Sequence, residues 1–417
     1  MKKRLIYDKI LAQQSSRKAS IIIGPRQVGK TTILKELQRQ LGGFFFDMDI
    51  FSDYEQVATY EKALATFKIN GYQEKQKEPF YVFLDEFQRY ADLPRVIKSI
   101  YDHHSNIKIY ATGSSSLAIK DSIQESLAGR KITTHVFPLS FAEFLHFRDR
   151  DDLSVKISRL NEIETEDYFA PIRDGYALLE EFLIFGGYPD VVLAKTMEEK
   201  KEALRSIFDL YIKKDFAEYV KMEKLRNASQ LMKILSINNG QAVNCAKYGA
   251  AAEISAETAQ NYLSILQETF IISTLRPYFI NKNKEISKMP KIYFLDNGVR
   301  NYFLGNFSNL DLRQDSGFLF EGFYVSELIK RGIDPEAIKY YRTKSGEEID
   351  IILDEPSLLL PIEIKFKKTT GARDISAVRR FVEKHKLSKG YVVAIGQLKR
   401  INKIEIVDCF RDIVRDS

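Results

Sequence analysis

One short glycine-containing motif constrains this chain more than any other feature. Residues 24–31 read GPRQVGKT, which fits the pattern GxxxxGK[ST]. An apolar run at residues 20–24 leads into it, and a helical pattern follows it. Glycines let the backbone curl so that its N–H groups face a phosphate, and the positive end of the following helix adds to the attraction. The sequence therefore predicts a phosphate-binding loop between a strand and a helix.

Two positions of this loop have a separate task in binding a nucleotide. Lys30 is expected to reach the β- and γ-phosphates, and Thr31 to offer its hydroxyl to Mg²⁺. ATP is the expected nucleotide, because the NKx run at residues 281–284 lacks the aspartate of the NKxD motif of GTPases. The residues assigned to nucleotide binding in the loop are Gly24, Pro25, Arg26, Gln27, Val28, Gly29, Lys30, Thr31 and Thr32.

An acidic pair ends a later apolar run, FYVFLDE at residues 80–86. Open parallel sheets bind ligands at the carboxyl ends of their strands. Asp85 is therefore expected to hold Mg²⁺ through water, and Glu86 to polarise the attacking water; the alternative is a surface acidic pair that only closes a strand. One strand later, Thr112 begins TGSSS, where a small hydroxyl could bind the γ-phosphate or the water. Serines there could equally cap a helix.

Arg130 closes the helix expected at residues 117–129, directly before the last strand of this region. An arginine at such a place could act as a finger in a neighbouring subunit, neutralising charge that develops during phosphoryl transfer. That role requires a homo-oligomer. The alternative is an arginine that hydrogen-bonds the last carbonyls of its own helix.

The hydrophobic pattern divides the chain into four expected domains. Residues 1–137 alternate apolar runs with helical patterns, as βαβ units do, which predicts an α/β fold with a doubly wound parallel sheet. Residues 138–230 are expected to be helical. Residues 231–300 follow the order helix, helix, helix, hairpin of a winged helix, and residues 310–417 return to an α/β pattern.

Three charged side chains in the last of these domains are expected to meet. Glu363 and Lys365 alternate with apolar residues on one strand, so both project from the same face, and Asp350 does the same on the preceding strand. Carboxylates suit Mg²⁺ or Mn²⁺, and a nearby lysine can orient a water. Preceded by a helix that carries Glu321, this set resembles the PD-(D/E)xK nuclease fold, which implies metal-dependent catalysis by Asp350, Glu363 and Lys365.

Composition limits the classes of protein to consider. The 417 residues include 2 cysteines, too few for a disulfide framework or a zinc site, and a reducing compartment fits best. No run is long and apolar enough for a membrane helix, so a cytoplasmic protein without membrane partners is expected. Residues 361–404 carry 12 Lys or Arg and 3 Asp or Glu. Such a segment could bind DNA, or it could simply be a solvated basic face.

Several of these motifs together resemble one family of AAA-type ATPases from bacteria and archaea, whose C-terminal domain has a poorly known function. The motifs are GPRQVGKT, FLDEFQR, TGSSS, AGR at 128–130, FGGYP at 185–189, GFLFEGF at 317–323, RTKSGEEIDIIL at 342–353 and IEIK at 362–365. The resemblance implies a P-loop ATPase core, a helical lid, a winged helix and a nuclease-like end. What the ATPase drives stays open between a DNA-acting nuclease and a nucleotide-dependent switch or protein-binding module that does not cleave.

Overall fold

The computed structural model describes residues 2–114, 126–162, 172–217, 220 and 224–414. The chain forms two compact units. Unit 1 consists of Met1–Pro138 with Glu268–Phe270, and unit 2 of Leu139–Gln267 with Ile271–Ser417. Unit 1 contains the predicted phosphate loop, and unit 2 contains the C-terminal carboxylates.

Unit 1 is built on a parallel sheet with the strand order β2-β3-β4-β1-β5, which confirms the predicted α/β fold. The predicted helix at 117–129 lies largely outside the described residues. In chain order the elements are α1 (Tyr7–Leu11), β1 (Ala19–Gly24), α2 (Lys30–Leu41), β2 (Phe44–Asp47), α3 (Phe51–Val57), α4 (Tyr60–Ile69), β3 (Phe80–Asp85), α5 (Leu93–His103), β4 (Ile107–Ser114) and β5 (Lys131–His135).

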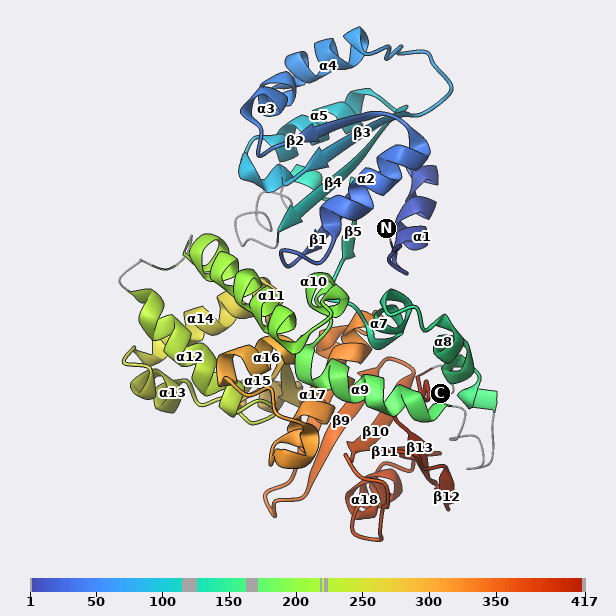
Figure 1. Ribbon diagram of the computed structural model, residues 1–417, viewed down its shortest axis with the longest axis vertical. Helices are drawn as coiled ribbons and strands as arrows, with labels where there is room; N and C mark the ends of the chain where they lie inside the picture. Colours follow the sequence, from blue (N-terminus) through green and yellow to red (C-terminus); the bar gives the residue numbers. More distant parts are fainter. Residues whose placement is uncertain (1, 115–125, 163–171, 218–219, 221–223, 415–417) are drawn as a thin grey trace. The chain divides into compact units, whose positions relative to one another are not determined.

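Helices cover both faces of this sheet. Val82 and Leu84 of β3 share a core with α3, α4 and α5, whereas Phe83 between them points to the other face. Helix α2 packs on that second face, where its Leu34 and Leu37 are fully buried (Figure 1). Right-handed crossovers produce this arrangement. The connection from β1 to β2 runs toward one edge of the sheet, whereas the connections from β2 onward run back in the opposite direction, so their helices lie on opposite faces. The loop after β1 therefore opens at the carboxyl edge of the sheet.

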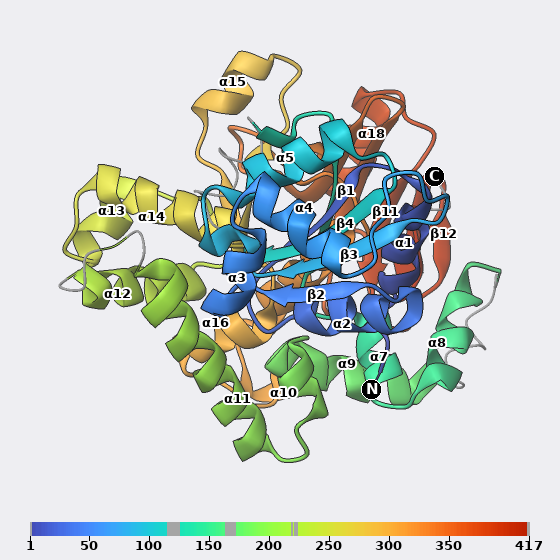
Figure 2. The same ribbon diagram turned by 90° about the horizontal axis from the view of Figure 1, so that it is seen from above.

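Unit 2 combines a helical part with a mixed sheet. Helices α11 to α14 gather at one end of the unit and strands β11 to β13 at the other (Figures 1 and 2). Its helices are α7 (Phe141–Phe147), α8 (Asp151–Ser158), α9 (Arg173–Phe185), α10 (Pro189–Leu193), α11 (Met197–Leu210), α12 (Leu225–Ile237), α13 (Cys245–Ala251), α14 (Ala256–Glu268), α15 (Lys282–Ser287), α16 (Asn297–Leu304), α17 (Ser316–Lys330) and α18 (Ser376–Lys384).

The sheet of unit 2 has eight strands in the order β12-β13-β11-β10-β9-β8-β6-β7. Strands β6 and β7 were expected to form the wing of a separate winged helix, and that expectation is not confirmed. Instead β6 pairs in parallel with β8, so the hairpin is the edge of the larger sheet, and the polar segment inside it forms α15. The strands are β6 (Ile272–Pro277), β7 (Lys291–Phe294), β8 (Ile338–Arg342), β9 (Glu348–Glu355), β10 (Leu358–Ile364), β11 (Gly390–Ala394), β12 (Lys399–Ile401) and β13 (Ile404–Asp408).

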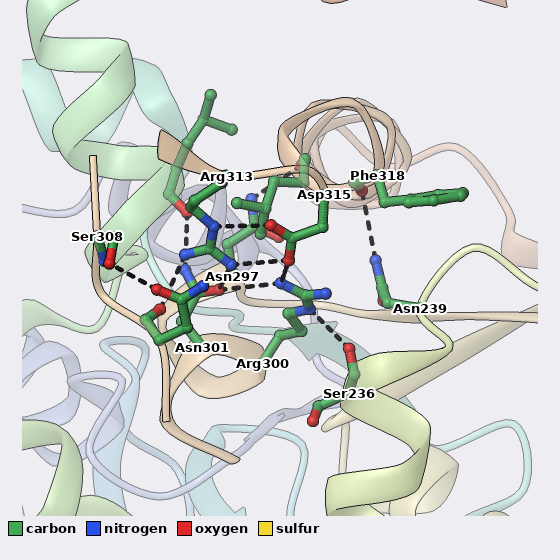
Figure 3. Close-up of polar contacts among 12 residues, drawn as sticks. Ser236, Asn239, Asn297, Arg300, Asn301, Ser308, Arg313, Asp315 and Phe318 are labelled. Atoms are coloured by element: carbon green, nitrogen blue, oxygen red, sulfur yellow. Dashed lines mark hydrogen bonds and ion pairs between the residues drawn. The ribbon is translucent and has the colours of Figure 1, made fainter. Parts of the chain in front are cut away.

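A buried polar network fixes the connection between α16 and α17 (Figure 3). Arg300, almost fully buried, donates from Nε to the carbonyl of Ser236 at 2.8 Å and is paired with Asp315. Arg313 donates to the same Asp315 carboxylate and to Asn301 Oδ1, each at 2.8 Å. Burial alone would raise the pKa of Asp315, but the two arginines hold it well below its usual range. The network connects the helical part of unit 2 to α17.

Candidate functional site

The predicted phosphate loop has the backbone that its glycines suggested. Gly29 lies in the left-handed region with φ +93°, and so does Gln27 with φ +60°. Gly24 meets a packing constraint instead, because a Cβ there would lie 1.9 Å from the carbonyl oxygen of Val136. Strand β1 ends at Gly24 and α2 begins at Lys30, so the loop joins the two elements as predicted.

Two cations hold the loop from within unit 1. Lys30 is buried, and its Nζ donates to the carbonyls of Gly24 at 2.9 Å and Pro25 at 2.8 Å. Arg4 is 7% exposed and donates to the carbonyl of Val28 at 2.5 Å. Sequence reasoning missed Arg4, since nothing in the local pattern of the N-terminal segment links it to a loop more than twenty residues away.

Three of the predicted site residues meet at the carboxyl edge of the sheet. Asp85, at the end of β3, is almost fully buried and accepts hydrogen bonds from the side chains of Thr112 and Thr31. Burial raises the pKa of the Asp85 carboxyl, while the two threonine hydroxyls act in the opposite direction. The loop, the acidic strand end and the neighbouring strand thus contribute one side chain each to a single polar group.

Glu86 is held in an uncommon backbone conformation directly beside this group. Its φ of +50° is in the left-handed region, which is rare for a residue with a side chain and is often found at functional sites. Its N–H donates to Thr112 Oγ1 at 3.2 Å. The amide of Gln88 donates to the Glu86 carboxylate and, at 2.8 Å, to Ser114 Oγ. Gln88 lies in the FLDEFQR motif, but the sequence analysis gave it no role; the remaining serines of TGSSS lie outside the described residues.

The Thr31 and Asp85 side chains fit a magnesium ion. Both supply oxygen ligands, and they already lie in hydrogen-bond contact. Within the described part of the chain, no group of three or more His, Cys, Asp or Glu side chains could hold a metal ion. Nucleotide-bound Mg²⁺ does not need such a group, because it takes one or two protein ligands together with phosphates and water.

Arg130 lies at the end of the sheet where the strands begin, whereas the phosphate loop lies at their carboxyl end. The N–H of Ala19 donates to the Arg130 carbonyl at 2.9 Å, so Arg130 is level with the start of β1. The loop follows the other end of that strand, roughly 16–20 Å away for six residues. The guanidinium forms a two-pronged pair with Asp102 of α5, at 2.7 and 3.2 Å. Arg130 therefore does not reach the nucleotide site of its own unit 1.

The residues predicted for the second site do come together in unit 2. Strands β9 and β10 pair antiparallel, and the N–H of Ile364 donates to Asp350 Oδ2 at 2.8 Å. Lys365 Nζ is paired with the Glu363 carboxylate, whose Oε2 is buried without a hydrogen-bond partner. We call the acidic group formed here, together with its lysines and a tyrosine, the carboxylate cluster; its members are Glu321, Glu348, Asp350, Glu363, Lys291, Lys365 and Tyr293.

Burial and mutual repulsion raise the pKa values of Glu321, Asp350 and Glu363. Burial first, and then the Asp350 charge, raise the pKa of Glu321 to about 7 and that of Glu363 to about 8. Lys365 opposes the rise at Glu363, and Lys291 opposes the rise at Glu321. The cluster thus contains more carboxyl groups than lysines, and Glu321 and Glu363 retain protons near neutral pH.

A basic surface is found in the same part of unit 2. Two of its cations are neutralised locally, since Lys367 pairs with Asp374 at 2.6 Å and Arg380 with Glu347 at 2.5 Å. The exposed basic residues of segment 361–404 are Lys367, Lys368, Arg373, Arg380, Lys384, Lys386, Lys399, Arg400 and Lys403.

Comparison with known families divides the chain into three matched segments. A family described as an AAA domain matches residues 16–145. Residues 176–310 and 316–409 match two further families, each described as a domain of unknown function (DUF8612 and DUF4143). The parallel sheet, the loop and the first match define residues 16–145 as a domain of the AAA-type P-loop ATPase class, the class that binds nucleotides.

The curated relatives have no described function. An uncharacterized protein of Methanocaldococcus jannaschii is 27% identical over 89% of this chain and 80% of its own length. One of Haemophilus influenzae is 24% identical over 93% of each chain, and one of Mycobacterium tuberculosis is 23% identical over 84% of this chain and 70% of its own. Resemblance to these proteins covers nearly the whole chain, both units included.

Solved structures give weaker likenesses. A Walker-type ATPase of Pyrococcus abyssi is 14% identical, with a TM-score of 0.43 over 73% of this chain and 96% of its own. The Holliday junction branch migration motor RuvB of Thermotoga maritima is 14% identical, with a TM-score of 0.27 over 69% of this chain and 95% of its own. TM-scores below 0.5 do not establish a shared fold over these lengths.

Among the described residues, no helix has both the length and the apolar character needed to cross a bilayer.

Proposed function

We propose that this chain is a Mg²⁺-dependent ATP hydrolase. The observation that carries the proposal is the single polar group formed by Thr31, Asp85 and Thr112, with Glu86 directly beside it. These residues come from the phosphate loop and from the ends of two neighbouring strands, and they meet where the loop opens. Together they supply the functions that ATP hydrolysis needs.

Each side chain has a defined task in this reaction. Lys30 and the N–H groups of the loop bind the phosphates, and Thr31 and Asp85 hold Mg²⁺, which neutralises phosphate charge when bound. Glu86 orients and polarises the attacking water. Gln88 fixes the Glu86 carboxylate through the hydrogen bond that it donates. Thr112 binds both Asp85 and the backbone of Glu86, so the metal-binding and water-binding groups keep one relative position.

Replacing the lysine of the loop tests the proposal. Lys30→Ala removes the buried ammonium, and we expect ATP binding or turnover to be lost. Lys35→Ala is the matched control, because Lys35 is an exposed lysine on the same helix. Turnover should be measured with ATP and with GTP. Unchanged ATP turnover in the Lys30→Ala variant contradicts the assignment.

We further propose that the ATPase acts on DNA through unit 2. The carboxylate cluster and the exposed basic residues of segment 361–404 support this, because phosphodiester cleavage needs carboxylates for a divalent cation and a positive surface for the backbone. Asp350 and Glu363 would hold the cation, and Lys365 would orient the water. The proposed location is the cytoplasm, which is the location expected from the sequence.

A switch or protein-binding module that does not cleave is the second candidate. The observation in its favour is that Glu363 and Glu321 already pair with lysines, and no group of three acidic, histidine or cysteine side chains among the described residues could hold a metal. In that case nucleotide binding in unit 1 would change the affinity of the chain for a protein partner.

Cleavage assays separate the two candidates. The wild-type protein, Lys365→Ala and Lys30→Ala would be incubated with linear, supercoiled and branched DNA in Mg²⁺ or Mn²⁺, with and without ATP. Cleavage that disappears in Lys365→Ala supports the nuclease, and its change in Lys30→Ala measures the coupling to ATP. Absence of cleavage on every substrate supports the switch.

A further inference from the structure

Arg4 connects the phosphate loop to the segment that follows β5. Its guanidinium donates to the carbonyl of Val28, a residue of the loop, at 2.5 Å and to the carbonyl of Phe137, two residues after β5, at 3.0 Å. That segment also lies beside the end of β1, because the N–H of Val136 donates to the carbonyl of Ile23 at 2.8 Å. Arg4 is 7% exposed, so its two hydrogen bonds form away from bulk water.

The N-terminal segment that carries Arg4 is held in place by contacts of its own. Tyr7, the first residue of α1, is 1% exposed, and its hydroxyl donates to Gln40 Oε1 of α2 at 2.9 Å. Gln13 Nε2 donates to Thr134 Oγ1 of β5 at 2.9 Å. These contacts do not use the Arg4 side chain. A substitution of Arg4 should therefore remove its hydrogen bonds and leave the segment where it is.

The hydrogen bond to Val28 fixes the peptide group between Val28 and Gly29. In a trans peptide the C=O and the N–H point in opposite directions, so a carbonyl held by Arg4 directs the Gly29 N–H away from Arg4. Gly29 is the N-cap residue of α2 and has φ +93°, and a glycine adopts positive and negative φ with similar ease. The conformation of this peptide is therefore not fixed by a side chain on Gly29. N–H groups at the start of a helix are the ones that bind phosphate.

We propose that Arg4 is a positioning residue of the nucleotide site, which holds the peptide between Val28 and Gly29 with its N–H directed toward the phosphates of ATP. This inference rests on the ATP hydrolysis proposed for unit 1. It adds a residue that acts through the backbone of the loop. The N–H that Arg4 orients binds phosphate both before and during the reaction, so its loss should weaken nucleotide binding without slowing the chemical step.

Equilibrium binding tests this role. The whole chain, as wild type and as Arg4→Met, would be titrated with ATP in Mg²⁺ and with pyrophosphate, which carries phosphates alone. We expect the Kd of Arg4→Met to rise about 10- to 100-fold for both ligands, as for the loss of a hydrogen bond to a charged group. At saturating ATP, kcat should stay within about twofold of the wild type while KM rises. A wild-type Kd in the folded variant, or a lower kcat with an unchanged Kd, overturns the proposal.

Lys108→Met is the matched control. Lys108 is 3% exposed and lies on β4 of the same sheet. It also binds backbone carbonyls, those of Ser16 at 3.0 Å and Lys18 at 2.5 Å, but these precede β1. We expect Lys108→Met to lower the melting temperature, as Arg4→Met does, and to leave both Kd values unchanged. An equal rise of Kd in the two variants would assign the effect to lost stability and overturns the proposal.

Arg4→Lys separates the geometry of the hydrogen bonds from the positive charge. Lysine keeps the charge but lacks the planar fork of donors that a guanidinium offers. We expect its Kd for ATP to stay at least about fivefold above that of the wild type. A wild-type Kd in Arg4→Lys would show that charge alone suffices, and it overturns the positioning role. This variant carries the test if Arg4→Met does not fold.

A parallel measurement on Lys30→Ala separates this inference from the proposed function. Loss of ATP binding or turnover in Lys30→Ala, together with a wild-type Kd in Arg4→Met, overturns the positioning role alone. Absence of both ATP and pyrophosphate binding in the wild type overturns the nucleotide site and the role of Arg4 together, while the cleavage assays still report on unit 2.

Discussion

At the scale of single residues, Glu86 has a conformation that its neighbours hold in place. A non-glycine residue with φ +50° costs free energy, and here the Thr112 hydroxyl and the Gln88 amide both bind it. The direction of its carboxylate is therefore set by side chains that a change at Glu86 itself would leave intact. A substitution at Glu86 should therefore distinguish nucleotide binding from hydrolysis.

We expect Glu86→Gln to bind ATP normally and to hydrolyse it about 10² to 10⁴ times more slowly, since an amide cannot accept a proton from water. The measurement is single-turnover hydrolysis beside equilibrium binding of ATP. Glu78→Gln, at an exposed position just before β3, is the control and should behave as the wild type. Equal loss of binding and hydrolysis in Glu86→Gln would assign Glu86 a structural role instead.

The buried acids of the cluster predict how stability depends on pH. The pKa of Glu321 is raised to about 7 and that of Glu363 to about 8, from an unfolded value of 4.5 for each. The folded state therefore holds protons that the unfolded state has lost, and this contribution to stability is complete below about pH 4.5 and disappears as the pH rises through about 7 to 8. In metal-free protein, the urea midpoint of unit 2 should fall over that range.

Glu363→Gln should flatten this dependence, because glutamine has no proton to release. Glu383→Gln is the control, since Glu383 is exposed on α18 and should leave the slope as it is. The midpoints can be followed by circular dichroism. An unchanged slope in Glu363→Gln would show that the pH dependence arises elsewhere.

At the scale of elements, the FGGYP segment connects two helices around one buried carboxylate. Gly186 ends α9 with φ +76°, and a Cβ there would lie 2.0 Å from Asp296 Oδ1. The Gly187 N–H donates to Asp296 Oδ2 at 2.6 Å, and the Val299 N–H donates to Oδ1 at 3.1 Å. Asp296 thus caps α16 while it binds the turn after α9, and the space it needs is available only beside a glycine.

Gly186→Ala should therefore destabilise unit 2 by more than about 3 kcal/mol, as steric and conformational penalties combine. Gly305→Ala is matched to it: Gly305 follows α16 with φ +73°, and no atom lies within 4 Å of a Cβ there. That variant should cost only about 1 kcal/mol, for the conformation alone. Urea unfolding measures both, and similar losses in the two variants would rule out the steric explanation.

Local patterns predicted the elements better than they predicted the pairing between elements. The strand–loop–helix around Lys30 is encoded in consecutive residues, and the structure has it. The pairing of β6 with β8 joins residues about sixty positions apart, such as Arg276 and Lys339, and no local pattern specifies it. For the same reason Lys291 and Tyr293 were missed, although their spacing along β7 is typical of a strand face.

At the scale of the whole molecule, the position of Arg130 limits how it can contribute to ATP hydrolysis. Its carbonyl is level with Ala19 at the start of β1, and its guanidinium is bound to Asp102, at the edge of the sheet remote from the phosphate loop. A contribution within the same unit is thus excluded by the strand register. If Arg130 acts in hydrolysis, it must do so on the nucleotide of a second copy of the chain, after release from Asp102.

Mixing two inactive variants tests this expectation. We expect Arg130→Ala to lower ATP turnover about 10³-fold by removing positive charge from the transition state, and Lys30→Ala to abolish it. In a mixed oligomer, the intact Arg130 of the Lys30→Ala chain can serve the intact loop of the Arg130→Ala chain, so the mixture should regain part of the activity. Arg95→Ala, at an exposed position on α5, should keep full turnover alone. A mixture no more active than its components, or a fully active Arg130→Ala monomer, would leave Arg130 with the structural role that its pair with Asp102 already describes.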